Sequence, residues 1–391
     1  MSVYSNLKNG AEPSHGRVTA YINLTAVRDN FEEIHRHLPS GTKIMAVLKA
    51  DGYGHGALPI AKMMEKEDYI WGFAVAAVSE ARAMREQGLK KPILILGYTF
   101  EEDYRWMVRN EVRPVIFTEE MAVRFSQAGK AENHPVCFHA AVDTGMSRIG
   151  FSDSWESVQE ISRIASLPYM KLEGIFTHYA RADEADKTSA MTQYYRFRHF
   201  CDTLKKTLHT DLICHSANSA AILDIPETHD SLVRAGIIIY GIYPSEEVDH
   251  SRIHLRPAME LKSQVAYVKK VPAGTPVSYG GTFVTQRETE IATIPVGYAD
   301  GYPRSLSSRG CVLIHGRRVP ILGRICMDQF MVDVTGMDVH VLDEVTLLGR
   351  DQDACIPVEE ISAGSERFPY EFICDIGARV PRVYVTETDE S

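Results

Sequence analysis

The chain has 391 residues, of which 45% are hydrophobic and 24% are charged, so it can bury a core large enough for two domains or one extended barrel. Its formal net charge of -10 gives no support to binding of nucleic acid or an anionic membrane, which would favour a basic patch. The seven cysteines include no C-x-x-C pair, so neither a disulfide framework nor a zinc site is indicated, and we expect a reducing, cytoplasmic compartment. Small molecules are the expected partners.

The first elements precede a repeating pattern. We expect residues 1–16 to form a flexible N-terminal tail, followed by a strand near residues 18–24 and a helix over residues 26–38. Eight short apolar runs then alternate with longer amphipathic stretches. In chain order these runs are KIMAVLKA, WGFAVAAV, PILILGY, RPVIFT, VCFHAAVDT, KLEGIFTHY, DLICHSANS and LVRAGIIIYG.

Eight strands that alternate with helices are the number expected of a (β/α)8 TIM-type barrel, whose strands are buried on both faces and read as almost continuous apolar runs. After the second run, Ser79 could cap a helix and Gly88 could end it. We therefore assign residues 17–255 to a cofactor-binding barrel domain. A doubly wound open sheet is the alternative.

The pattern changes in residues 256–391. Segments such as MELKSQVAYVKKV and CVLIHGRRVPILG alternate apolar and polar residues between Gly and Pro breaks, and few helices are indicated. We expect a C-terminal, mainly β domain here, and the strand near residues 18–24 could pack with it. The predicted fold class is α/β plus β.

A lysine ends the first apolar run, where a barrel would place catalytic groups. The apolar neighbours of Lys49 disfavour a charged amine, which can lower its pKa toward values useful in catalysis. A neutral amine can condense with an aldehyde, and pyridoxal 5'-phosphate is the usual biological aldehyde held this way. Ser219, at a helix start, and Gly236, without a Cβ, could serve its phosphate. The alternative is an ordinary lysine whose ammonium reaches solvent.

Other polar residues lie at or near the ends of later runs, namely Arg148, His178, Asn218 and Arg234. Taken alone, His178 also fits a satisfied core histidine, and no second ligand at metal spacing accompanies it, so no metal site is indicated. The segment GYGHG is not a dinucleotide-binding motif, and neither a Walker sequence nor a hydrolase triad is identifiable.

Eight segments occur in an order that closely resembles the bacterial pyridoxal-phosphate-dependent alanine racemases. They are AVLKADGYGHG, VDTGMSRIG, HSANSA, RAGIIIYG, VSYGGTF, IPVGYADGY, GRICMDQ and RVPR, and the resemblance spans roughly residues 17–385. It implies the barrel and the β domain, and an isomerase that interconverts L- and D-alanine with pyridoxal 5'-phosphate and supplies D-alanine for the cell wall. It also implies a head-to-tail homodimer with shared active sites.

Carried onto the matching positions, the resemblance makes Lys49 the aldimine lysine and one of two catalytic bases, with the partner subunit's Tyr279 as the other. Two bases are needed because one group can remove a Cα proton from its own face, while inversion requires reprotonation from the opposite face. Without the motif, Tyr279 is an ordinary strand tyrosine. The other implied contacts are Tyr53, His178, Ser219, Arg234, Gly236 and Ile237 for the cofactor, Arg148 and the backbone of Met327 for the substrate carboxylate, and Asp183 and Tyr298 at the entrance.

Arg234 matches the partner of the pyridine nitrogen. A guanidinium donates a hydrogen bond without readily losing a proton, so the ring nitrogen should stay unprotonated, which disfavours side reactions. With Tyr279, this choice favours racemisation over a lyase or decarboxylase, and a non-catalytic cofactor-binding protein would not need Tyr279. Without the motif, Arg234 could form a salt bridge across the barrel.

Two positions depart from the family pattern. Many members have a carbamylated lysine where this chain has Ala141, so Arg148 must be held in another way, by an anion or another side chain. A tyrosine commonly precedes RVPR, where this chain has Ala378. Because the smaller side chain opens the pocket, a racemase of broader specificity, acting on serine or larger amino acids, is the alternative.

Overall fold

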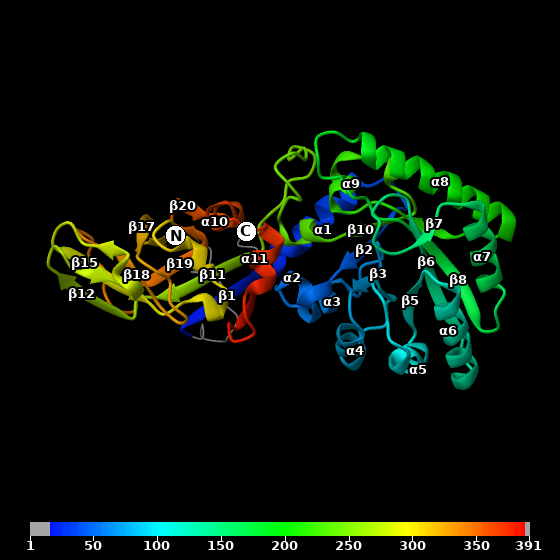
Figure 1. The fold of residues 1–391 in the computed structure, drawn as a ribbon, viewed down its shortest axis with the longest axis horizontal. Helices are drawn as coiled ribbons and strands as arrows, with labels where there is room; N and C mark the ends of the chain where they lie inside the picture. The colour runs from blue at the N-terminus through cyan, green and yellow to red at the C-terminus, as the bar shows by residue number, and fades with distance from the viewer. Residues whose placement is uncertain (1–15, 388–391) are drawn as a thin grey trace. The chain divides into compact units, whose positions relative to one another are not determined.

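The computed structural model describes residues 16–387, so the tail expected at residues 1–16 lies, except for its last residue, outside the described residues. The chain divides into two compact units, both drawn in Figure 1. Among the described residues, the first unit comprises residues 16–25, 53–55 and 258–387, and the second comprises Ala26–Gly52 and Gly56–Pro257.

Eight parallel strands form the centre of the second unit, and helices cover their outer side (Figure 1). Their hydrogen-bonded order is β10-β2-β3-β4-β5-β6-β8-β9, and the N–H of Arg234 donates to the carbonyl of Ala217 across the remaining gap. The predicted (β/α)8 class is therefore confirmed. The strands are β2 (Lys43–Val47), β3 (Ile70–Val75), β4 (Ile93–Ile95), β5 (Val112–Ile116), β6 (Val136–Asp143), β8 (Met170–Phe176), β9 (Ile213–His215) and β10 (Leu232–Ala235), with the short β7 (Phe151–Ser152) paired to β6.

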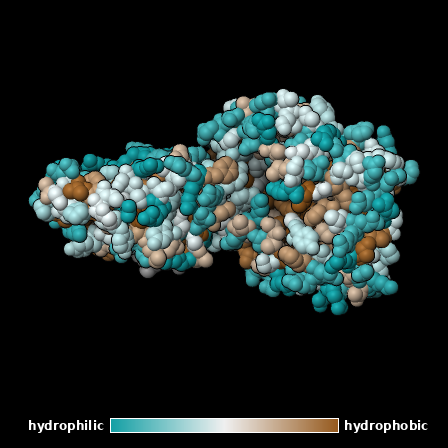
Figure 2. Space-filling model, viewed as in Figure 1, coloured by the Kyte–Doolittle hydropathy of each residue, from teal (hydrophilic) through white to brown (hydrophobic). Residues whose placement is uncertain are grey.

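The helices of this unit are amphipathic, with apolar residues such as Phe31 and Ile34 buried. On the face shown in Figure 2, hydrophilic residues cover most of the outer helices. Among the described helices, none is both long enough and apolar enough to cross a membrane. The helices are α1 (Leu24–His37), α3 (Ala57–Met64), α4 (Val78–Glu86), α5 (Glu101–Arg109), α6 (Glu119–Glu132), α7 (Trp155–Ala165), α8 (Thr188–Leu208) and α9 (Ser219–Asp224), with the 3-10 turns η2 (Pro226–Thr228) and η3 (Ile237–Tyr240). The segment α2 (Lys49–Tyr53) is a left-handed turn, and its last residue belongs to the first unit.

One helix start differs from the prediction. Helix α4 begins at Val78, so Ser79 lies inside it and the prediction of Ser79 as the cap is wrong. The carboxylate of Glu80 accepts the backbone N–H groups of Ala76 and Ala77 at 2.9 and 3.0 Å, which satisfies donors at the start of the helix instead. Gly88 does follow the helix end, with φ of 83°.

A long mixed sheet forms the first unit, in the order β12-β15-β18-β17-β16-β19-β11-β1-β21, with β20 paired to β19. The N-terminal strand β1 pairs antiparallel with β11 and parallel with β21, so the strand expected near residues 18–24 joins this sheet. The strands are β1 (Val18–Asn23), β11 (Met259–Gln264), β12 (Tyr267–Val271), β13 (Pro276–Val277), β14 (Phe283–Val284), β15 (Thr289–Ile294), β16 (Cys311–Ile314), β17 (Arg317–Leu322), β18 (Phe330–Asp333), β19 (Glu344–Asp351), β20 (Ala354–Ile356) and β21 (Arg382–Val385).

Short helical segments complete this mainly β unit. They are η4 (Tyr279–Gly281), η5 (Tyr298–Asp300), η6 (Arg304–Leu306), α10 (Val358–Ser365) and α11 (Pro369–Asp375).

Candidate active site

Lys49 follows strand β2, and the chain then makes a left-handed turn. Ala50, Asp51 and Gly52 have φ of 53°, 49° and 63°, and Tyr53 continues the turn with φ of 50°. For residues with a Cβ, this conformation costs about 1–2 kcal/mol each. A strained turn directly after the candidate lysine is a feature that occurs often at active sites.

Side chains hold this turn in place. The N–H of Ala50 donates to the carboxylate of Glu80 at 2.5 Å, and the N–H of Ala57 donates to the carboxylate of Asp51 at 2.8 Å. Because Glu80 also binds the start of helix α4, the turn is anchored to the neighbouring βα loop. The backbone on which Lys49 sits is thus fixed from both sides.

Three cations lie around His178, which follows strand β8. Burial lowers the pKa of His178, and the positive charges of Arg234, Arg148 and Lys49 lower it further, to about 3. The imidazole is therefore neutral at physiological pH. The structure brings these four predicted residues together from different strands, and a mouth this rich in positive charge suits an anionic ligand.

Arg234 lies inside the barrel, with only 3% of its surface exposed. Its Nη1 donates to the carbonyl of His215 at 2.7 Å, and its Nη2 donates to the carbonyls of Thr177 and Ser216 at 2.8 and 2.9 Å. Burial lowers its pKa to about 10, which still leaves it charged at neutral pH. Among the described residues no ion pair includes Arg234, so the alternative of a salt bridge across the barrel is not supported, and its Nε takes no part in the described hydrogen bonds.

The carboxyl ends of β9 and β10 place two backbone turns side by side. The N–H of Gly236 donates to the hydroxyl of Ser219 at 3.0 Å. Helix α9 begins at Ser219 as expected, with Asn218 as the cap that accepts the N–H of Ala221. Ile237 begins the next 3-10 turn and is buried. Both segments thus present helical N-termini at the same rim, where backbone N–H groups can bind an anion.

Arg148 lies on the exposed loop after β6. The carboxylate of Asp143 holds this loop by accepting the N–H groups of Gly145 and Ser147 at 2.9 and 3.0 Å. Within the described part of the chain, Arg148 itself has no hydrogen-bond or ion-pair partner, and Ala141 is buried in the strand. The expected alternative partner of Arg148 is therefore not a described side chain.

In the mainly β unit, Tyr279 is 71% exposed and follows a strained residue. Ser278 has φ of 65° and ψ of -178°, a region occupied almost only by glycine. Its hydroxyl donates to the carbonyl of Arg324 at 2.5 Å and lies 3.4 Å from the sulfur of Cys326. These contacts fix the backbone that presents the phenol of Tyr279.

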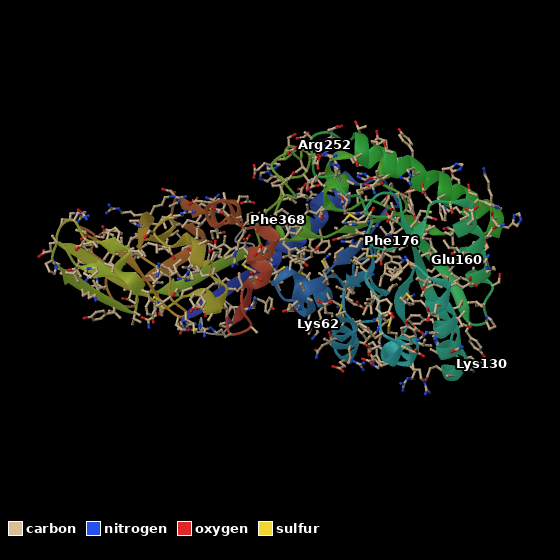
Figure 3. The ribbon with its side chains drawn as sticks, in the orientation of Figure 1. Lys62, Lys130, Glu160, Phe176, Arg252 and Phe368 are labelled. Carbon is tan, nitrogen blue, oxygen red and sulfur yellow. The ribbon has the colours of Figure 1, made fainter. Side chains whose placement is uncertain are left out.

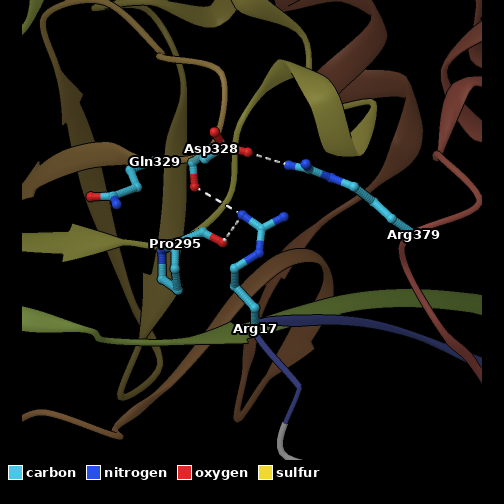
Figure 4. A pocket seen from close by; sticks show the side chains of 5 residues that line it. All are labelled: Arg17, Pro295, Asp328, Gln329 and Arg379. Atoms are coloured by element: carbon cyan, nitrogen blue, oxygen red, sulfur yellow. Dashed lines mark hydrogen bonds and ion pairs between the residues drawn. The ribbon is translucent and has the colours of Figure 1, made fainter.

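A buried carboxylate organises the loop that carries Tyr298. Asp300 is 1% exposed, accepts the N–H of Gly297 at 2.8 Å, and forms ion pairs with Arg17 and Arg379. These two arginines line a pocket together with Pro295, Asp328 and Gln329 (Figure 4).

The neighbouring loop carries Met327, whose carbonyl accepts the N–H of Ala299. Its next residue, Asp328, is contacted by both of these arginines, through its backbone by Arg17 and through its carboxylate by Arg379 (Figure 4). Tyr298 and Met327, both predicted site residues, are thus held on adjoining loops.

Three further predicted residues are described within their own units. Tyr53 is buried in the mainly β unit, in an edge contact with Tyr370 at 6.0 Å between ring centres, and burial raises its pKa. Ala378 is exposed in the same unit. In the barrel, the carbonyl of Asp183 accepts the hydroxyl of Ser245 at 2.5 Å.

The sequence did not predict the buried polar residues that are connected to Arg234 by hydrogen bonds inside the barrel. His139 and His215 are fully buried in β6 and β9, and Glu173 lies on β8. A signal was present, because VCFHAAVDT and DLICHSANS each place a histidine inside an otherwise apolar run.

The protein is therefore a (β/α)8-barrel protein that carries a lysine and a buried arginine at the ends of its strands. The model described as the N-terminal domain of alanine racemase matches residues 22–244, and the C-terminal domain model matches residues 258–384. The chain belongs to the alanine racemase family, whose members are isomerases.

Individual relatives match nearly the whole chain. An alanine racemase of Desulforamulus reducens is 45% identical over 369 residues, which cover 94% of this chain and 99% of that protein. The structure of an alanine racemase from Clostridium difficile is 40% identical, with a TM-score of 0.91 and coverage of 95% of this chain and 96% of that chain. A structure from Bartonella henselae, with covalently bound pyridoxal phosphate, is 28% identical, with a TM-score of 0.83 and coverage of 95% and 100%.

Proposed function

We propose that this chain interconverts L- and D-alanine with pyridoxal 5'-phosphate as its cofactor. The observation that carries the proposal is the gathering of Lys49, Arg148 and Arg234 around the neutral His178, in a chain of the alanine racemase family. The bound pyridoxal phosphate of the Bartonella henselae relative supports the choice of cofactor.

The chemistry of the barrel mouth fits this cofactor. Lys49 supplies an amine for covalent attachment, and the Nε–H of Arg234 supplies a charged donor for the ring nitrogen. A neutral His178 can pack beside the ring without adding charge. The remaining residues that would hold the cofactor, chiefly its phosphate, are Tyr53, Ser219, Gly236 and Ile237. When bound, the cofactor withdraws electrons from the substrate Cα and makes its proton easier to remove.

Two groups of the chain then move the Cα proton. Lys49 acts on one face of the substrate and Tyr279 on the other, so that a proton removed from one face is replaced from the opposite face. With an ordinary pKa of about 10, a phenol already carries the proton needed for donation, and it requires help from neighbours only when it acts as the base. Arg148 and the backbone of Met327 would hold the substrate carboxylate, which keeps Cα between the two groups.

We further propose a cytoplasmic head-to-tail homodimer that supplies D-alanine for peptidoglycan. In it, Tyr279 reaches the site of the other subunit, and Asp183 and Tyr298 line the entrance. The high exposure of Tyr279 supports this arrangement, since a side chain this accessible can serve another chain. No disulfide joins the seven cysteines, all of which lie among the described residues, and this suits a reducing compartment.

Reconstitution of the purified protein with pyridoxal phosphate tests the activity. We expect conversion of L-alanine to D-alanine with exchange of the Cα hydrogen in deuterated water. Lys49→Ala should lose both the activity and the long-wavelength absorbance of the bound cofactor. Absorbance without exchange in the unaltered protein would instead indicate a cofactor-binding protein.

Substrate range is a separate proposal. Ala378 is exposed and much smaller than the tyrosine common in the family, so we propose activity on serine, and on larger amino acids to a lesser extent. The ratio of kcat/KM for serine to that for alanine should fall in Ala378→Tyr. A strict preference for alanine in the unaltered protein would contradict this proposal.

A further inference from the structure

A chain of buried hydrogen bonds leads away from Arg234 through the barrel. The Nη1 of Arg234 lies 3.0 Å from the Nδ1 of His215, whose Nε2 lies 2.8 Å from the Nδ1 of His139. The Nε2 of His139 lies 3.4 Å from a carboxylate oxygen of Glu173. Four strands, β10, β9, β6 and β8, contribute one side chain each.

The chemistry of the two ends determines where the protons lie. A guanidinium can only donate, so the Nδ1 of His215 must accept and its proton must be on Nε2. That proton is donated to the Nδ1 of His139, which leaves the proton of His139 on Nε2, directed at the carboxylate of Glu173. Donation therefore runs in one direction from Arg234 to Glu173, and both imidazoles are neutral.

The environment of the two rings agrees with neutral histidines. Burial lowers the pKa of both His139 and His215, and the charge of Arg234 lowers both further. His215 is stacked on Phe176, which lies inside the barrel in Figure 3, at 5.0 Å between ring centres and 9° between planes. The rings of His139 and Trp71 lie 5.4 Å apart, measured between their centres.

Strand β8 packs closely against the ring of His139. A Cβ on Gly174 of β8 would lie 2.7 Å from the Nδ1 and Cε1 of His139, so the ring fits only because this residue is glycine. At the far end, Arg113 forms a two-nitrogen ion pair with Glu173 at 3.0 and 3.3 Å. The carboxylate of Glu173 thus has two partners, the guanidinium of Arg113 and the imidazole of His139.

We propose that Glu173 and His139 are positioning residues for Arg234, which act through His215. This proposal rests on the proposed function. The hydrogen-bonded relay of these residues connects the buried Arg234 to the carboxylate of Glu173, which Arg234 does not contact. Each hydrogen bond polarises the next, which strengthens the bond from Nη1 of Arg234 to His215. The guanidinium thereby stays charged and oriented toward the cofactor's ring nitrogen. The relay gives Arg234 a distant counter-charge, while a carboxylate in direct contact would offer a competing acceptor beside the cofactor.

Pyridoxal phosphate binding to the apoenzyme tests the relay in three variants. Glu173→Gln keeps an acceptor for His139 but removes the charge, and His139→Phe removes the connection. Arg113→Gln is the matched control, because it removes the ion pair and retains the carboxylate. We expect the first two to weaken cofactor binding about tenfold and to lower kcat with little change in KM, since each weakens hydrogen bonding to a buried charge. Glu173→Gln and His139→Phe should also shift the apparent pKa at which the absorbance of the bound cofactor titrates, and Arg113→Gln should leave this pKa unchanged.

Equal effects of Glu173→Gln and Arg113→Gln would overturn the proposal, because the carboxylate would then act only through its ion pair. Nitrogen NMR of the unaltered apoenzyme, with labelled histidine, keeps the test decisive if a variant fails to fold. We expect Nε2–H tautomers for His139 and His215 at neutral pH, and a proton on either Nδ1 would overturn the relay. Failure of the unaltered protein to racemise alanine would instead contradict the proposed function.

Discussion

Ser278 shows how a single residue can hold a strained backbone next to a proposed base. Its φ of 65° and ψ of -178° disfavour any side chain with a Cβ, yet its hydroxyl stabilises this conformation by donating to the carbonyl of Arg324. Strain of this kind persists only where surrounding contacts determine the conformation. We infer that Ser278 sets the direction in which Tyr279 leaves the chain.

Glycine and alanine replacements of Ser278 should separate strain from hydrogen bonding. Both lose the hydroxyl, but only Ser278→Ala keeps the Cβ, so Ser278→Gly should be more stable by about 1 kcal/mol in denaturant unfolding. Ser307, with an ordinary φ of -50°, is the control, and there alanine should be the more stable replacement. The same order at both positions would argue against strain at Ser278.

The carboxylate of Glu173 predicts a pH dependence of stability. Its burial raises the pKa, but hydrogen bonds from His139 and Arg113 and the positive charge of Arg113 outweigh this and lower it to about 2, below the ordinary value of 4.5. A group with a depressed pKa stabilises the fold above its unfolded pKa, and this contribution is lost as the pH falls from 4.5 toward 2.

We therefore expect Glu173→Gln to destabilise the protein most above pH 4.5, with the difference from the unaltered protein shrinking at lower pH. Unfolding curves over this pH range measure the difference. Glu102→Gln, at an exposed carboxylate, is the control and should show little effect at any pH. A constant difference for Glu173→Gln across the range would contradict the depressed pKa.

At the scale of elements, the strands were easier to predict than the turns. A strand buried on both faces needs a continuous apolar run, and all eight barrel runs carry this pattern. The left-handed turn after Lys49 has no comparable pattern, because Ala50 disfavours positive φ, and Asp51 tolerates positive φ without requiring it. Their conformation depends on side chains such as Glu80, 30 residues away in sequence. The wrong cap at Ser79 has the same cause, since Glu80 satisfies the helix start.

The strain in this turn can be tested by Ala50→Gly. Glycine adopts positive φ without the steric cost of a Cβ, so we expect the variant to be as stable as the unaltered protein or up to about 1 kcal/mol more stable. Ala83→Gly inside helix α4 is the control and should cost about 1 kcal/mol. Thermal or denaturant unfolding measures both, and an equal loss at the two positions would show that the turn is unstrained.

For the whole molecule, the proposed site requires residues from two chains. If the partner's Tyr279 completes the site of Lys49, then Lys49→Ala and Tyr279→Phe homodimers are each inactive. A mixed dimer has one site with both residues intact, so random association of equal amounts should restore about a quarter of the unaltered activity. Activity measured after refolding the variants together tests this, with each variant refolded alone as the control. If mixed dimers form but activity does not recover, Lys49 and Tyr279 of each site come from the same chain.

The sequence by itself determined the barrel, the β domain and the ordered motifs that carry Lys49, Arg234 and Tyr279, because strand burial and motif spacing are local properties of the chain. Only the tertiary structure decided which charges meet. The neutrality of His178 and the direction of the Glu173–His139–His215–Arg234 relay depend on groups that lie far apart in sequence and share one buried interior. In that interior, burial and neighbouring charge set the protonation of each group.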